Sequence, residues 1–118
     1  MDKNNELIQL DNELLVGYVQ SLGVDMVKKM FALYRQQVTI YLEDIEGSLL
    51  SDSASLWQEH CHKMKGAAGS VGLKALYARL KLMEKTTANR EDKARQLAEL
   101  KTHNKQAIAD FSDWIARI

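Results

Sequence analysis

The sequence has no proline, one cysteine and six glycines among its 118 residues. Because proline breaks helices, its absence leaves long stretches of the chain free to be helical. A single cysteine cannot form an internal disulfide, and the sequence contains no zinc-binding pattern such as C-x-x-C. From this cysteine usage we expect a reducing, cytoplasmic location and no metal site.

The sequence also lacks a charge excess, since 16 basic side chains balance 16 acidic ones. Nucleic-acid binders and polybasic membrane clamps usually have a basic surface, so neither partner is expected. The first 15 residues contain no apolar run long enough for a signal peptide or a membrane span. The chain opens on Met1, from which we expect a free-standing protein rather than an excised domain.

What the sequence does have is enough apolar residues, 46%, to build the core of one domain. We predict a single domain over residues 1–118, with residues 1–10 loosely ordered. Apolar residues recur at steps of three and four, which predicts helices. Asp11 and Asp25 are the expected N-caps of the first two, and Gly23 is expected to end the first.

The first three predicted helices cover about residues 12–21, 25–50 and 54–69. The fourth begins near residue 73, and its apolar pattern fades over residues 86–89. The fifth covers about residues 90–117. The first is short and the other four are long, with short turns between them. This pattern predicts an all-α fold, an antiparallel four-helix bundle with a short N-terminal helix. The apolar positions of these helices are interpreted as core.

One histidine of the third predicted helix lies on its polar face. At about 100° per residue, His62 points about 160° away from the centre of the apolar arc. That arc contains Trp57, His60, Cys61, Met64, Ala67, Ala68 and Val71. Adjacent helical residues diverge too far for His60, Cys61 and His62 to converge on one metal ion, so Cys61 is expected in the core and His60 at its edge.

Two glycines, Gly66 and Gly69, lie on the His62 side of this helix. A glycine inside a helix costs about 1 kcal/mol relative to alanine. Gly69 lies near the helix end, where a C-cap explains it. Gly66 is either a tolerated surface glycine or a position where the missing side chain lets another protein approach His62.

Glu84, on the fourth predicted helix, occupies a position where an apolar residue is expected. It is either a solvated residue at the helix edge or a hydrogen-bond acceptor for Nδ1–H of a histidine on the neighbouring helix. In the second case the tautomer is fixed, and Nε2 faces outward as a nucleophile. Lys65, one turn from His62, would offset negative charge arriving on that nitrogen.

The run HKMKGAAG, residues 62–69, resembles the signature of histidine-containing phosphotransfer (HPt) domains. That signature is a histidine, two residues, then Lys-Gly and small residues. The longer run HKMKGAAGSVGL, residues 62–73, is especially similar to the C-terminal HPt domains of aerobic respiration control sensor kinases. The resemblance implies the HPt fold, a four-helix bundle capped by a short N-terminal helix, over nearly the whole chain.

Position by position, the resemblance implies that His62 is phosphorylated at Nε2 and that Lys65 lies near the phosphoryl group. Glu84 stands where the family has a glutamine or glutamate that hydrogen-bonds the histidine ring. Gly66 is the small residue that permits docking of a receiver domain. The remaining expected docking residues are Gln58, Glu59 and Gly69 around His62, and Leu15 and Val19 on the first helix.

The implied function is a relay of phosphoryl groups between receiver-domain aspartates of a hybrid sensor kinase and a response regulator, in a bacterial multistep two-component phosphorelay. The receiver would supply magnesium, while this chain would act as a monomer without cofactor or ATP site. One alternative is a helical adaptor that binds a receiver without carrying phosphate. Another is the phosphorylation domain of a larger chemotaxis-type kinase.

Overall fold

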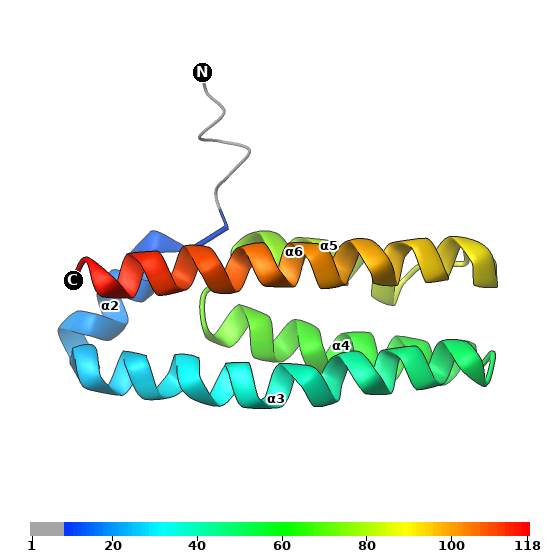
Figure 1. Cartoon of the computed structure of the whole chain (residues 1–118), viewed down its shortest axis with the longest axis horizontal. Coiled ribbons are helices and arrows are strands. Elements are labelled where there is room, and N and C mark those ends of the chain that lie inside the picture. The colour runs from blue at the N-terminus through cyan, green and yellow to red at the C-terminus, as the bar shows by residue number, and fades with distance from the viewer. Residues whose placement is uncertain (1–8) are drawn as a thin grey trace, which may run out of the picture.

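A computed structural model describes residues 9–118 of the chain. The helices of this range are α2 (Asn12–Leu22), α3 (Val24–Leu50), α4 (Ala54–Ser70), α5 (Lys74–Glu84) and α6 (Arg90–Ala116). The helices α3, α4, α5 and α6 pack in that cyclic order, and α2 packs on α3 at the end where α3 begins (Figure 1). The predicted all-α bundle with a short N-terminal helix is confirmed.

Side-chain caps set three of the helix starts in the described range, including that of α6, where Asn89 accepts a hydrogen bond from the backbone N–H of Asp92. Asp11 accepts a hydrogen bond from a backbone N–H in the first turn of α2, and Ser53 does the same for α4. Gly23, at φ 90°, ends α2 as predicted. The prediction that Asp25 caps α3 is wrong, because α3 begins at Val24 directly after this glycine. Asp25 lies in the first turn instead, where its charge suits the helix dipole.

The helices differ in length more than the sequence pattern indicates. Both α3 and α6 have 27 residues, whereas α5 has 11, the same as α2. The predicted set of four long helices is therefore wrong for α5, which ends at Glu84. In contrast, α4 continues through Ser70, so Gly69 lies inside the helix rather than at its cap.

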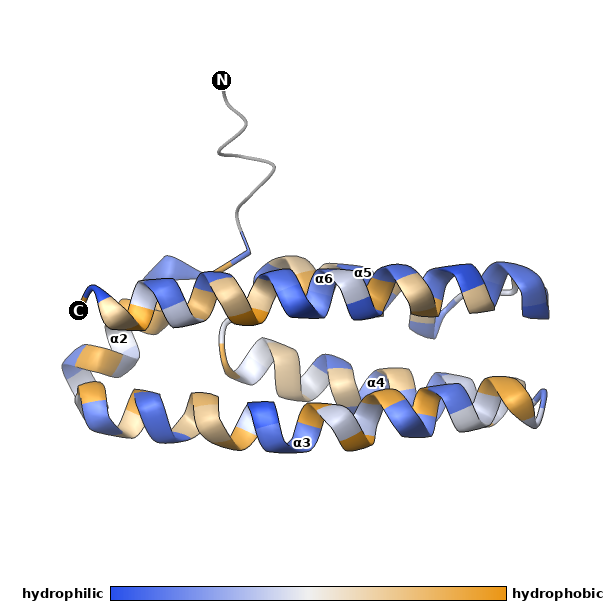
Figure 2. Cartoon of the chain, viewed as in Figure 1, coloured by the Kyte–Doolittle hydropathy of each residue, from blue (hydrophilic) through white to orange (hydrophobic). Residues whose placement is uncertain are grey.

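Figure 2 shows hydrophilic and apolar residues alternating along the helices, and the apolar faces of the helices meet in one core. Among its largest members, Trp57, Phe111, Ile45 and Leu100 have at most 1% of their surface exposed. The core includes one buried polar pair, in which the Tyr34 hydroxyl donates a 2.7 Å hydrogen bond to Asn104 Oδ1. Such a pair links α3 to α6 at a fixed register, because leaving either group unpaired would be costly.

The chain that precedes α2 packs against the start of α5. Leu10 and Leu73 form an isolated antiparallel bridge, and Gln9 is 7% exposed. Of the segment 1–10, for which loose order is predicted, residues 9 and 10 make these contacts and residues 1–8 lie outside the described range. None of the helices in the described range is both long and apolar enough to cross a membrane.

Candidate functional site

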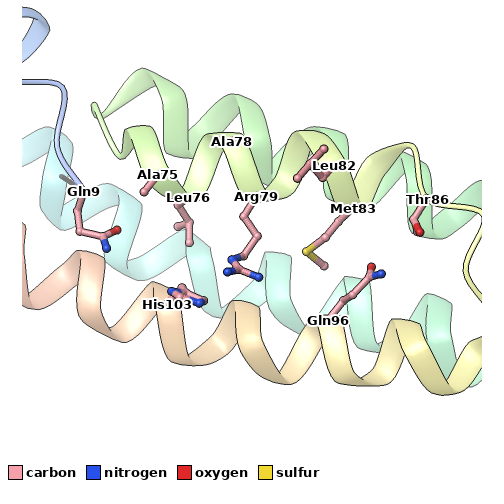
Figure 3. Close-up of a pocket in the computed structure, with 10 residues that line it drawn as sticks. All are labelled: Gln9, Ala75, Leu76, Ala78, Arg79, Leu82, Met83, Thr86, Gln96 and His103. Atoms are coloured by element: carbon pink, nitrogen blue, oxygen red, sulfur yellow. The ribbon is translucent and has the colours of Figure 1, made fainter. Parts of the chain in front are cut away.

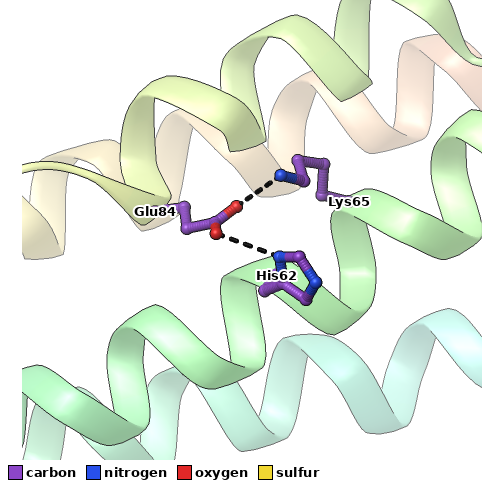
Figure 4. Close-up of polar contacts among 3 residues, drawn as sticks. All are labelled: His62, Lys65 and Glu84. Atoms are coloured by element: carbon purple, nitrogen blue, oxygen red, sulfur yellow. Dashed lines mark hydrogen bonds and ion pairs between the residues drawn. The ribbon is translucent and has the colours of Figure 1, made fainter.

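A carboxylate on α5 joins two side chains of α4 (Figure 4). Oε2 of Glu84 lies 3.0 Å from Nδ1 of His62, and Oε1 lies 2.7 Å from Nζ of Lys65. His62 and Lys65 are three residues apart on α4, so both project toward the neighbouring helix. The predicted hydrogen bond between His62 and Glu84 is present, and each oxygen of the carboxylate has its own partner.

The three side chains differ sharply in exposure. The His62 side chain is 65% exposed, whereas Glu84 and Lys65 are 12% and 15% exposed. A carboxylate can only accept a hydrogen bond from Nδ1, which favours the tautomer with its proton there. In Figure 4, Nε2 lies on the side of the ring away from Glu84. The arrangement therefore leaves an exposed Nε2 lone pair on an oriented ring.

The ion pair determines the charge of the site. The hydrogen bond from Lys65, with a further one from His62, holds the pKa of Glu84 below its ordinary value. The same contact raises the pKa of Lys65. Both groups are thus ionised near neutral pH, and the ammonium of Lys65 forms an ion pair with the carboxylate of Glu84. Sequence reasoning missed this ion pair, although the shared helix face of Lys65 and His62 could have indicated it.

The two glycines beside His62 have different surroundings. A Cβ on Gly66 would meet no heavy atom within 4 Å, so this surface is open. A Cβ on Gly69 would lie 2.9 Å from Cδ2 of Tyr77, because the ring packs directly on the helix backbone there. Tyr77 therefore covers part of the surface at Gly69, which is half-buried, and a docking role for Gly69 stays a prediction.

The expected docking residues also divide into exposed and buried ones. Gln58 and Glu59 are exposed on α4, where Glu59 pairs with Lys63 at 3.5 Å. Leu15 is 1% exposed, so its predicted docking role is wrong. Its side chain packs against Gly72 in the core. Val19 is half-buried and also packs against the core.

The other reactive side chains near His62 belong to the interior. Cys61 is fully buried, and this burial raises the pKa of its thiol to about 12. His60 is half-buried at the edge of the core. Within residues 9–118, no group of three or more His, Cys, Asp or Glu side chains is placed to hold a metal ion.

A cleft of about 540 Å³ lies between α5 and α6 (Figure 3). Its lining includes Arg79, Leu82 and His103, and it contains none of the three residues in Figure 4. The histidine site is therefore a surface feature of α4 and α5 rather than a pocket. Such a site suits chemistry with another macromolecule, which brings its own reactive group.

Known proteins resemble this chain both in sequence and in structure. The aerobic respiration control sensor protein ArcB of Escherichia coli (strain K12) is 33% identical over 67 residues, which are 57% of this chain and 9% of that protein. ArcB of Shigella flexneri gives the same figures. The chain thus spans a small part of the length of these relatives.

Two solved structures share the fold. The histidine-containing phosphotransfer domain of ArcB from Escherichia coli has a TM-score of 0.85 and 23% identity, covering 96% of this chain and 98% of that domain. The solution structure of that domain has a TM-score of 0.83 and 23% identity, covering 98% of this chain and 96% of that one. Residues 29–110 match the family model of the Hpt domain. The chain therefore belongs to the Hpt domain family, the histidine phosphotransfer domains of two-component systems.

Proposed function

We propose that this protein carries a phosphoryl group on Nε2 of His62 between the aspartates of two receiver domains. The observation that carries this proposal is the exposed imidazole with Nδ1 held 3.0 Å from Glu84. The hydrogen bond fixes the ring and the tautomer before a partner arrives, so little reorganisation precedes the attack.

The chemistry begins at the aspartyl phosphate of a receiver. The Nε2 lone pair attacks phosphorus, a P–N bond forms, and the P–O bond to the aspartate breaks, releasing a carboxylate. The transition state is loose, with charge on the equatorial oxygens. Attack through Nε2 leaves the proton on Nδ1 and a positive charge on the ring, which the adjacent carboxylate of Glu84 stabilises. The reverse reaction passes the group to a second receiver.

Lys65 supplies a positive charge beside this ring. Its ammonium neutralises Glu84, so an incoming phosphoryl group does not meet an unpaired carboxylate. We assign Lys65 the role of phosphoryl charge partner on this basis. The receiver is expected to bring the magnesium ion, since transfer of a phosphoryl group generally needs a metal to neutralise its oxygens.

A receiver would dock over Gly66 and the neighbouring surface of α3. Gly66 has free space above it, and a groove of about 230 Å³ begins one residue further along α4. Leu33 and Tyr41 of α3 and Ala67 of α4 line this groove, and Leu33 is 57% exposed. An exposed apolar groove between α3 and the helix that carries His62 suits a protein partner. Gln58 and Glu59 would contact the receiver on the other side of His62.

Transfer of label from phosphorylated receiver domains tests the proposal. We expect acid-labile, base-stable label on the wild type and none on His62→Gln. The variant His103→Gln is a matched control, because this histidine is half-buried on α6 and outside the site.

Two results would contradict the proposal. Label that persists in His62→Gln would mean that another residue accepts the group. Receiver binding without label on the wild type would favour a helical adaptor that carries no phosphate. A panel of receivers is needed, because transfer depends on the matching surface of the partner as well as on the histidine.

A further inference from the structure

A line of contacts runs along the surface from Gly69 to His62. The ring of Tyr77 packs on Gly69, Lys65 lies over that ring, Glu84 pairs with Lys65, and His62 bonds to Glu84. We propose that Tyr77 is a positioning residue for His62, acting through Lys65 and Glu84, and that Gly69 provides the space for it. This inference rests on the proposed phosphotransfer function.

The first contact explains why a glycine occupies the interior of α4. A Cβ at Gly69 would lie 2.9 Å from Cδ2 and 3.3 Å from Cε2 of Tyr77, which is closer than packed carbon atoms allow. The ring would have to move outward, since it is 39% exposed and the backbone of α4 is fixed. The glycine thus lets α5 place an aromatic ring against the backbone of α4.

The second contact places that ring under a cation. Nζ of Lys65 lies 5.8 Å from the centroid of the Tyr77 ring, within the range of a cation–π interaction. Lys65 and Gly69 are four residues apart, so they lie on the same side of α4 and one ring reaches both. A lysine side chain has many rotamers, and the ring removes part of that freedom before the ammonium pairs with Glu84.

The third contact transmits this constraint to the histidine. Lys65 is 15% exposed and holds Oε1 of Glu84, which turns Oε2 toward His62. Without the lysine, either oxygen could face the histidine, and solvent would compete for both. The ring of Tyr77 is therefore expected to increase the fraction of time that Glu84 holds Nδ1 of His62.

Two substitutions of Tyr77 separate this role from simple surface coverage. Tyr77→Phe keeps the aromatic face, whereas Tyr77→Leu keeps apolar cover but removes the cation–π contact. Leu82→Ala on the same helix is the matched control, because Leu82 is 76% exposed and outside the line of contacts. We expect Tyr77→Leu to slow label transfer about two- to fivefold, the equivalent of one exposed cation–π contact. Tyr77→Phe and Leu82→Ala should retain the wild-type rate.

The ¹⁵N NMR signals of the His62 ring provide a second measurement that needs no phosphate. Wild type and Tyr77→Phe should show the Nδ1–H tautomer, and Tyr77→Leu should show a larger share of the other tautomer. Gly69→Ala alone should also increase the share of the other tautomer. Added to Tyr77→Leu, it should change that share little further, because both changes break the same line of contacts.

An unchanged tautomer and rate in Tyr77→Leu would overturn this inference and leave phosphotransfer through His62 intact. Equal losses in Tyr77→Leu and Leu82→Ala would also overturn it, because they would indicate a loss of surface packing. Absence of label on the wild type would contradict the proposed function, while the NMR signals would still test whether Tyr77 positions the ring.

Discussion

Nε1 of Trp57 donates a 2.8 Å hydrogen bond to the carbonyl oxygen of Met83. Trp57 is 1% exposed at the start of α4, and Met83 directly precedes Glu84 at the end of α5. The bond ties the last turn of α5, where carbonyl groups lose their helical donors, to the helix that carries His62. The bond therefore fixes the position of Glu84 along the axis of α4.

Removing this hydrogen bond should weaken both the fold and the site. Trp57→Phe loses the donor and part of a buried ring, so we expect the free energy of unfolding to fall by about 1–3 kcal/mol. Urea denaturation measures this change. Under conditions where the variant is folded, label transfer to His62 should also be slower. Trp114→Phe, on α6, is the control and should leave transfer unchanged; equal transfer in the wild type and Trp57→Phe would contradict the prediction.

The acid stability of the protein should depend on Glu84. Hydrogen bonds from Lys65 and His62 lower its pKa from 4.5 in the folded state. A carboxyl group of this kind stabilises the fold above its unfolded pKa, and that contribution is lost as the pH falls through the lower, folded value. We therefore expect the wild type to lose more stability than Glu84→Gln as the pH falls below 4.5. Urea denaturation at a series of pH values measures this, and parallel curves for the two proteins would refute it.

Substitutions of Gly66 should separate stability from docking. Because a Cβ there meets nothing, Gly66→Ala should stabilise the helix by up to about 1 kcal/mol. Gly66→Phe should fold but bind a phosphorylated receiver at least about tenfold more weakly, since a clash of about 1.4 kcal/mol suffices. Gly47→Phe is the matched control, because Gly47 is also helical and open. Receiver binding can be titrated by calorimetry, and equal affinity of the two phenylalanine variants would exclude docking over Gly66.

The thiol of Cys61 should be unreactive in the folded protein. Burial raises its pKa to about 12, and only the thiolate form reacts with alkylating agents. At about pH 8 we expect alkylation at least about 100-fold slower than for a free cysteine, with full reactivity in denaturant. Mass spectrometry over time measures the rate. Rapid alkylation without denaturant would show that the core opens near His62 under native conditions.

The sequence predicted which segments are helical and that His62 is exposed, because these depend on local periodicity, but it did not predict that α5 has only 11 residues. For Glu84 the sequence left two interpretations open, a solvated residue at the helix edge or a hydrogen-bond acceptor for a histidine, because a carboxylate at an apolar position needs a partner; the structure shows the second. It was wrong about Leu15, whose burial depends on the space left by Gly72 more than 50 residues away in the chain. It did not predict that Tyr77 packs on Gly69, because Tyr77 lies on a different helix.

The amino-acid sequence by itself determined an all-α bundle with His62 on an outer face, because amphipathic spacing fixes which side of each helix is buried. Only the tertiary structure decided what that histidine touches. The register of α4 against α5 places Lys65 on Glu84 and Tyr77 on Gly69. That register depends on packing and hydrogen bonds between helices, such as the bond from Trp57 to Met83, which helical periodicity does not specify.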